Sequence, residues 1–290
     1  MNARHDPAVH ALPDTRFAAL PSGVRLPYTA CGGGAPLLFV HGSLCDYRYW
    51  QAQASVLSRH FLCISVSLSH YWPGEDPGAA HAFSWQTHVA ELAAFIAALR
   101  LGPVHLVGHS RGGCVAFRLA QAHPHLVRTL TLADPGGPLQ VDGTAPAALP
   151  AATEAVRAQV AALIDGGAIA AGVERFVDSV SLPGTWQRSP ASFRTMALAN
   201  ATTLPKQFRD PLPPYTQALA RGVHCPTLLV AGERSPRMYR DNVAQLEAWM
   251  PRAQRRVVAG ASHGMTVTHP AAFNRLLQAF LAAPDAPAAP

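Results

Sequence analysis

The sequence lacks long hydrophobic runs. Its longest apolar stretches, such as PLLFV and ELAAFIAAL, are far shorter than the roughly 20 residues that a membrane-spanning helix needs. The first residues, MNARHDPAVHALPD, contain no apolar segment of the kind that a secretory signal carries. We therefore expect a cytoplasmic protein that does not associate with membranes, with flexible tails at 1–14 and 284–290.

Cysteine is scarce and is not spaced for disulfides or metal binding. The chain contains no CxxC pair, and its cysteines are odd in number, at Cys31, Cys45, Cys63, Cys114 and Cys225. Neither a disulfide framework nor a zinc ribbon is expected from that pattern, which fits a reducing compartment. The sequence also lacks HExxH and P-loop strings, so we expect neither a metal nor an organic cofactor.

Lysine is almost absent, because Lys206 is the only one. The net charge of +6 comes from scattered arginines, with no basic run and no interleaved aromatic residues. This pattern argues against nucleic acid as a partner. With 49% hydrophobic and 14% charged residues, the composition is typical of a compact protein with a sizeable core. Whether it forms a homodimer stays open.

Short apolar runs alternate with helical patterns along most of the chain, and no internal repeat is present. Most of these runs are almost continuously apolar, as is typical of buried parallel strands. The alternation predicts an α/β fold, with a mostly parallel central sheet flanked by helices on both faces. We expect strands at 16–20, 24–30, 36–40, 61–67, 104–108, 126–133, 226–232 and 255–260, and helices at 84–100, 113–123, 239–250 and 270–283.

Residues 136–223 break this alternation. Three helical pieces, at 151–164, 171–180 and 191–203, are separated there by proline and glycine. We interpret the segment as a helical cap inserted after strand 6 into a core formed by 15–135 and 224–283. Large side chains of the cap would form an apolar roof over a site or merely the core of the cap itself; they are Phe176, Trp186, Phe193, Met196 and Phe208.

One serine stands between glycines directly after the apolar run VHLVG, in Gly108-His109-Ser110-Arg111-Gly112. A serine raised on a sharp strand-to-helix turn needs small residues two before and two after it, since larger ones would clash with the strand and helix. The G-x-S-x-G string is common, but the expected strand before it and helix after it make Ser110 the candidate nucleophile of a nucleophile elbow. Ligands bind at this end of a parallel sheet, and the helix start places its positive dipole end under a developing oxyanion.

In these features the chain resembles the α/β-hydrolase fold superfamily over nearly its whole length, in the capped branch of serine esterases, lactonases and C–C hydrolases. The resemblance implies an oxyanion hole made by the backbone N–H groups of Ser43, in the string His41-Gly42-Ser43, and of Arg111. It also implies a histidine base after the last strand, where His263 stands. His269 is a weaker alternative, because it directly precedes a helix start.

The acid that orients this histidine departs from the commonest pattern of the family. Many members carry an aspartate where this chain has Ser235, in the string Gly232-Glu233-Arg234-Ser235. Some members carry the acid after the preceding strand instead, and Asp134 stands there. We favour Asp134, with Glu233 as its main competitor and Asp241 as a third candidate, although Asp134 also suits an ordinary turn before proline and glycine.

A serine at the elbow implies acyl transfer, whereas related epoxide hydrolases and haloalkane dehalogenases carry aspartate there. We expect a hydrolase that cleaves a small to medium-sized hydrophobic carboxylic ester or lactone through an acyl-enzyme, with Ser110 as nucleophile, His263 as base and Asp134 as acid. A C–C bond hydrolase, a lyase or cofactor-free oxygenase on the same scaffold, and a binding protein remain alternatives.

Further side chains near these motifs have two interpretations each. The Arg111 side chain would bind a substrate carboxylate or turn away, and Cys45 is expected to be an apolar filler. Side chains expected to contact the substrate, with structural packing as the alternative, are His41, His109, Tyr71, Trp72 and Trp186, and the loop neighbour His70 has the same two interpretations.

Overall fold

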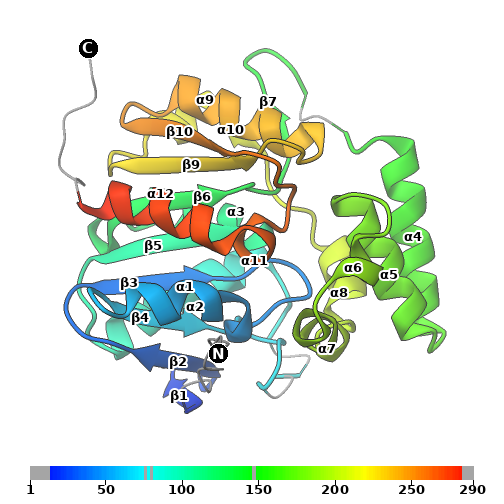
Figure 1. Ribbon diagram of the computed structural model, residues 1–290, viewed down its shortest axis with the longest axis horizontal. Coiled ribbons are helices and arrows are strands. Elements are labelled where there is room, and N and C mark those ends of the chain that lie inside the picture. The colour runs from blue at the N-terminus through cyan, green and yellow to red at the C-terminus, as the bar shows by residue number, and fades with distance from the viewer. Residues whose placement is uncertain (1–13, 75–76, 79–80, 146–147, 283–290) are drawn as a thin grey trace, which may run out of the picture.

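The computed structural model of the chain describes residues 14–74, 77–78, 81–145 and 148–282. Except for Asp14, the tails expected at 1–14 and 284–290 lie outside the described residues. The centre of the fold is an eight-stranded sheet in the order β1-β2-β4-β3-β5-β6-β9-β10 (Figure 1). The strands are β1 Arg16–Ala19, β2 Arg25–Cys31, β3 Pro36–Val40, β4 Leu62–Val66, β5 Val104–His109, β6 Val127–Ala133, β9 Thr227–Gly232 and β10 Ala253–Val258.

The sheet is mixed but mostly parallel. Strand β2 pairs antiparallel with both β1 and β4, while β3, β4, β5, β6, β9 and β10 pair in parallel. The expected fold class is therefore confirmed. Every residue of β5 and β9 is buried, in agreement with their mostly apolar sequences.

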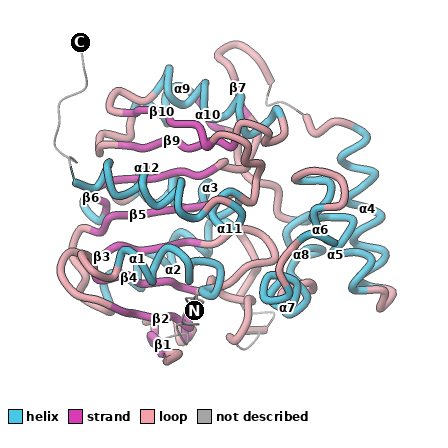
Figure 2. The backbone as a smooth tube through the Cα atoms, viewed as in Figure 1, coloured by secondary structure: helices cyan, strands magenta, loops and turns pink. Residues whose placement is uncertain are grey.

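Helices cover both faces of the sheet (Figure 2). One face carries α2 (Trp85–Ala98), α3 (Arg111–Ala122) and α10 (Arg237–Trp249). The other carries the 3₁₀ turn η1 (Tyr47–Trp50), α1 (Gln51–Leu57) and α12 (Pro270–Ala282). The short helices η2 (Pro124–Leu126), α9 (Gln217–Arg221) and α11 (Met265–Thr268) lie in connections.

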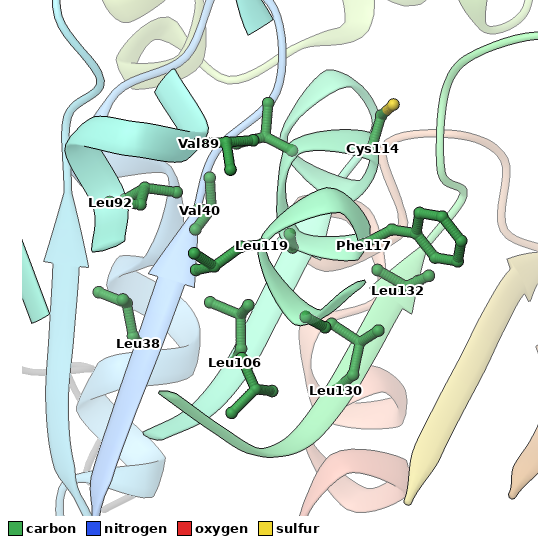
Figure 3. Close-up of a cluster of buried hydrophobic side chains, with 14 of the residues drawn as sticks. Leu38, Val40, Val89, Leu92, Leu106, Cys114, Phe117, Leu119, Leu130 and Leu132 are labelled. Atoms are coloured by element: carbon green, nitrogen blue, oxygen red, sulfur yellow. The ribbon is translucent and has the colours of Figure 1, made fainter. Parts of the chain in front are cut away.

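Successive strand residues point to opposite faces and so feed two separate cores. Leu38 and Leu106 pack with Leu119 of α3 in the first core (Figure 3). Leu37 and Phe39 enter the second, together with side chains of α1 and α12. The sheet is thus held from both sides, and its strand ends are fixed positions for side chains.

The insertion after β6 is helical and lies beyond the carboxyl ends of the parallel strands (Figure 1). At the base of the insertion, β7 (Leu139–Gln140) pairs in parallel with β8 (Tyr215–Thr216), and this pairing brings the two ends of the insertion together. The sequence did not predict these two strands. Strands of two residues carry no periodic signal. The cap helices are α4 Ala151–Asp165, α5 Ile169–Val180, α6 Thr185–Arg188, α7 Ala191–Ala199 and α8 Thr203–Arg209.

The helix expected over 191–203 is broken at Asn200. The side-chain amide of this buried residue donates to the Met196 carbonyl at 2.9 Å and to Asp46 Oδ2 at 2.8 Å. Its Oδ1 accepts from the Trp72 amide at 2.8 Å. Asn200 thereby joins the cap to two core loops, and a new helix starts after it.

Among the described residues, no helix combines the length and the apolar character that crossing a bilayer requires.

Candidate active site

The turn that carries Ser110 is tight and strained. Ser110 lies between the end of β5 and the start of α3, with φ of 54° and ψ of −122°. A positive φ is unfavourable for a residue with a side chain, so the surroundings must impose it. The Ser110 amide donates to the Ala133 carbonyl at 3.1 Å, and its carbonyl accepts from Gly113 and Gly136, each at 2.9 Å.

Three glycines make room for this turn. A Cβ atom at Gly108 would lie 2.5 Å from the Gly112 carbonyl oxygen, and one at Gly112 would lie 2.2 Å from the His41 carbonyl oxygen. A Cβ at Gly42 would lie 2.9 Å from the Ser110 Cβ. Gly112 is therefore needed for the close approach of the loop after β3, a contact that the sequence alone did not specify.

A hydrogen-bonded chain links three of the predicted site residues. His263 Nε2 lies 3.0 Å from Ser110 Oγ, and its Nδ1 lies 3.1 Å from Asp134 Oδ2. All three residues are buried, and Asp134 is fully so. Because an ionised carboxylate only accepts, Nδ1 carries the ring proton and Nε2 is left to accept the serine hydroxyl proton. The arrangement can therefore deprotonate Ser110 during an attack.

The competing residues are engaged elsewhere. Glu233 is exposed, and its Oε2 accepts from the Gly260 amide at 2.7 Å. Asp241 is exposed and forms an ion pair with Arg237. His269 Nδ1 lies 2.9 Å from Thr268 Oγ1. Within the part of the chain that the structure describes, no cluster of His, Cys, Asp or Glu is arranged to hold a metal ion.

Ser235, which stands at the position where the resemblance implies an acid, contacts the Asp134 carboxylate. The buried Ser235 hydroxyl donates to Asp134 Oδ2 at 2.5 Å, the same oxygen that faces His263. This second donor fixes the carboxylate and disperses its charge. The sequence placed Ser235 at the correct strand end but gave no sign of this hydrogen bond.

Two backbone amides flank Ser110. The Arg111 amide is the first of α3, and the Ser43 amide follows Gly42, where an added Cβ would lie 2.9 Å from the Ser110 Cβ. Outside regular helices and strands, the described residues form many backbone hydrogen bonds, and neither the Ser43 amide nor the Arg111 amide donates any of them. The Ser43 hydroxyl is turned to the cap, where it donates to Gln207 Oε1 at 2.6 Å. Both N–H groups can therefore serve an oxyanion beside Ser110.

The Arg111 side chain turns away from Ser110 and is paired. Its guanidinium forms an ion pair with the Asp210 carboxylate and lies 5.0 Å from the Phe83 ring centroid. Asp210 Oδ2 also accepts from the Trp85 amide at 2.9 Å. The charge of Arg111 is thereby compensated within the protein, and the residue ties the elbow to the end of α8.

His41 and His109 hold loops together. His41 is fully buried, its Nδ1 donating to the Gly42 carbonyl at 2.8 Å and its Nε2 accepting from the Leu68 amide at 3.1 Å. Burial lowers the pKa of His41 to about 4. His109 Nε2 lies 2.8 Å from the His263 carbonyl oxygen, and burial also lowers the pKa of His109. These contacts favour the structural interpretation of both rings.

The three other aromatic side chains expected at the substrate also pack against protein. Tyr71 is buried with its ring 4.6 Å from that of His41. Trp72 is 38% exposed and stacks under the guanidinium of Arg48 at 3.7 Å. Trp186 lies in the core cluster of the cap. Met196 of the expected roof packs in the second core instead, and Cys45 is an apolar member of that core, as expected.

Tyr239, in the first turn of α10, is a site residue that the sequence analysis missed. Its ring stacks on His263 with centroids 3.9 Å apart and planes inclined by 19°. Burial raises the pKa of Tyr239, as does the Asp134 charge, while Arg157 and the Ser110 hydroxyl lower it. Tyr239 thus presents a protonated hydroxyl next to the Ser110–His263 pair. In the sequence it is one more aromatic residue in a helical pattern, a position that usually means core.

Comparison with known proteins agrees with this geometry. A family model described as alpha/beta hydrolase fold matches residues 35–270. A (E)-2-((N-methylformamido)methylene)succinate hydrolase of Acinetobacter baylyi is 24% identical over 88% of the chain and 93% of the relative. A 2-hydroxy-6-oxo-2,4-heptadienoate hydrolase of Pseudomonas putida is 33% identical, but this match spans only 39% of the chain and 42% of that relative.

Solved structures share the whole architecture. The enol-lactonase from Burkholderia xenovorans superposes with a TM-score of 0.76 and 18% identity, over 92% of this chain and 100% of that one. A thermophilic esterase from Thermogutta terrifontis reaches 0.75 with 22% identity, over 93% and 98%. At such identities the likeness establishes the fold alone.

Proposed function

Because the chain belongs to the α/β hydrolase family, we propose that it is a serine hydrolase that cleaves a small to medium-sized carboxylic ester or lactone through an acyl-enzyme. The observation that carries the proposal is the continuous hydrogen-bonded chain from Ser110 through His263 to Asp134. A buried serine on a strained turn, with a histidine in reach of its hydroxyl, has the parts of an activated nucleophile.

In the first half of the reaction, Ser110 Oγ attacks the carbonyl carbon of the substrate as His263 Nε2 takes its proton. The negative oxygen of the tetrahedral intermediate accepts from the backbone N–H groups of Ser43 and Arg111. When the intermediate collapses, the bond to the leaving oxygen breaks and His263 returns the proton to it. The alcohol departs, and the acyl group stays on Ser110.

In the second half, water replaces the serine hydroxyl. His263 takes a proton from the water, whose oxygen attacks the acyl carbon, and then returns that proton to Ser110 Oγ as the acid leaves. Asp134 stabilises the imidazolium in both halves, and the Ser235 hydroxyl holds the carboxylate oxygen in place. The stacked ring of Tyr239 keeps the imidazole from rotating.

A second candidate substrate class is an amide. The Acinetobacter relative, whose match covers 88% of this chain, is named as a hydrolase of a formamido compound. The same residues would act in the same order, with nitrogen as the leaving atom. The ester and lactone remain our first choice, because an alcohol leaves a tetrahedral intermediate more readily than an amine does.

The proposal is tested with a panel of 4-nitrophenyl esters and unsubstituted lactones, comparing the wild type with Ser110→Ala. We expect ester hydrolysis by the wild type and a loss of at least about 10³-fold in kcat/KM in Ser110→Ala. Ser43→Ala is the matched control, since it keeps the backbone N–H and should retain activity within about tenfold. A wild type that cleaves none of these substrates but consumes oxygen or splits cyanohydrins would overturn the proposal.

A further inference from the structure

The turn that supplies the Ser43 amide contains a strained residue. The Cys45 amide donates to the Gly42 carbonyl at 3.4 Å, so residues 42–45 form a turn with Leu44 in its third position. Leu44 has φ of 61°, a left-handed conformation that favours glycine or asparagine and is costly for a bulky side chain. The surroundings must therefore hold Leu44 in place, and with it the turn that contains the Ser43 amide.

The side chain of Leu44 packs in the cap, although its backbone belongs to the core. Leu44 is 1% exposed and lies in a hydrophobic cluster whose other buried members all belong to the cap. These members include Val160 and Ile164 of α4 and Leu204 of α8. Burial of Leu44 among cap side chains offsets the cost of its left-handed backbone. The conformation of the turn therefore depends on the cap.

Hydrogen bonds join both ends of the same loop to the cap. The Ser43 hydroxyl donates to Gln207 Oε1 at 2.6 Å, and Gln207 Nε2 donates to Thr203 Oγ1 at 3.1 Å. The Thr203 hydroxyl donates to the Asn200 carbonyl at 2.7 Å, and Asn200 Nδ2 donates to Asp46 Oδ2 at 2.8 Å. A hydrogen-bonded path thus leaves the 42–46 loop at Ser43, follows the cap and returns to the loop at Asp46.

This path is shielded from water. Its members Gln207, Thr203, Asn200 and Asp46 are all buried, so breaking one of the bonds would leave a polar group without a partner. The cap therefore cannot shift without disturbing the turn that carries the Ser43 amide.

We infer that the cap holds the oxyanion hole in its active geometry, with Leu44 and Gln207 as the positioning residues for the Ser43 amide. This inference rests on the proposed function, in which that amide binds the negative oxygen of the tetrahedral intermediate. A donor stabilises this oxygen only at hydrogen-bond distance, so a turn released from the cap would place the amide poorly. The oxygen becomes charged only after the substrate has bound, so the loss should fall on kcat and not on KM.

The first test compares two substitutions that create cavities in the same cluster of the cap. Leu44→Ala and Ile164→Ala remove the same number of carbon atoms from buried positions, and both should lower the melting temperature. In steady-state hydrolysis of a 4-nitrophenyl ester by folded protein, Leu44→Ala should lower kcat about 10- to 100-fold and change KM by less than about threefold. Ile164→Ala should keep kcat within about threefold, and so should Leu44→Met, which refills the same space.

A double-mutant cycle tests the hydrogen bond between the turn and α8. Ser43→Ala and Gln207→Leu each remove one partner and should each lower kcat about 3- to 10-fold, and the double variant should lose no more than the larger of the two. The matched control is Gln187→Leu, because Gln187 is an exposed cap glutamine that donates to Glu174 at 2.9 Å, and it should keep the wild-type kcat. Losses that multiply in the double variant, or equal losses in Leu44→Ala and Ile164→Ala, would overturn the inference.

Hydrogen–deuterium exchange separates this inference from the proposed function, because it needs no turnover. A peptide that contains residues 42–46 should exchange at least about tenfold faster in Leu44→Ala than in the wild type or in Ile164→Ala. That result in a protein that hydrolyses no ester would support the role of the cap and overturn the proposed reaction. Ester hydrolysis by the wild type, with equal exchange of this peptide in Leu44→Ala and the wild type, would overturn the role of the cap alone.

Discussion

Replacing Asp134 by asparagine tests whether the buried carboxylate at the end of the Ser110–His263–Asp134 hydrogen-bonded chain is needed for activity. The Asp134 carboxylate is fully buried, and its Oδ2 accepts from both His263 Nδ1 and the Ser235 hydroxyl. Its Oδ1 has no hydrogen-bond partner among the described residues. An asparagine with its amide nitrogen in the Oδ1 position would bury an unsatisfied donor, at a cost of about 1–3 kcal/mol.

The opposite orientation of the amide is therefore favoured, and it changes the tautomer of the His263 imidazole. With its amide nitrogen toward His263, asparagine requires Nδ1 to accept, so the ring proton moves to Nε2, which can no longer take the proton of Ser110. We expect kcat to fall about 10³- to 10⁴-fold, equivalent to about 4–5.5 kcal/mol of transition-state stabilisation.

The assay is steady-state hydrolysis of a 4-nitrophenyl ester, with circular dichroism melting to show that each variant is folded. Glu233→Gln is the control, because Glu233 bonds Gly260 at the surface, and it should keep activity within about threefold. Adding Ser235→Asp to Asp134→Asn should restore at least tenfold, since position 235 already contacts the same site. Activity of Asp134→Asn above a tenth of the wild type, or an equal loss in Glu233→Gln, would refute the assignment.

Three further outcomes follow from the geometry. Ser235→Ala should lower kcat about 3- to 30-fold and leave KM for a neutral ester nearly unchanged, because the hydroxyl donates its hydrogen bond to the Asp134 carboxylate. An unchanged kcat in steady-state assays would contradict this role. Gly112→Ala should destabilise the protein by about 3 kcal/mol or more in urea titration, because its Cβ would meet a backbone carbonyl at 2.2 Å, whereas Gly33→Ala, with open space around it, should be nearly neutral; equal effects would contradict the close approach. Burial lowers the pKa of His41 from 6.5 to about 4, so the unfolded chain binds a proton between these values that the folded chain does not. The free energy of unfolding should therefore fall as the pH is lowered from 6.5 toward 4, by up to about 1.4 kcal/mol per pH unit. His41→Gln should flatten this slope between pH 6.5 and 4.5, and an unchanged slope would show that His41 does not titrate in this way.

The parts of the site that could be predicted are those that depend on local chain geometry. Ser110 follows a continuous apolar strand and is flanked by glycines, so its place at a strand-to-helix turn is visible within a dozen residues. His263 could be named because it follows the last predicted strand. Asp134 could be named because strand ends of a parallel sheet meet at one edge, even though Glu233 also follows a strand.

The remaining contacts depend on how distant segments pack. Tyr239 lies on an amphipathic helix, where an aromatic residue has the same pattern whether it faces a site or not. Trp72 was expected at the substrate but lies against Arg48, a pairing set by the loop conformations. The bend at Asn200 depends on Asp46, which is 154 residues away. No periodic pattern contains such information.

Whether Ser110 is an activated nucleophile is read most directly from the intact mass of the protein after reaction with a fluorophosphonate, compared between the wild type and Ser110→Ala. The wild type should gain the mass of one phosphonyl group, because a serine activated by a neighbouring base reacts readily with this reagent and an ordinary serine does not. The variant should gain none. Folded wild-type protein without an adduct, or an adduct that persists in Ser110→Ala, would contradict the claim that Ser110 is the nucleophile.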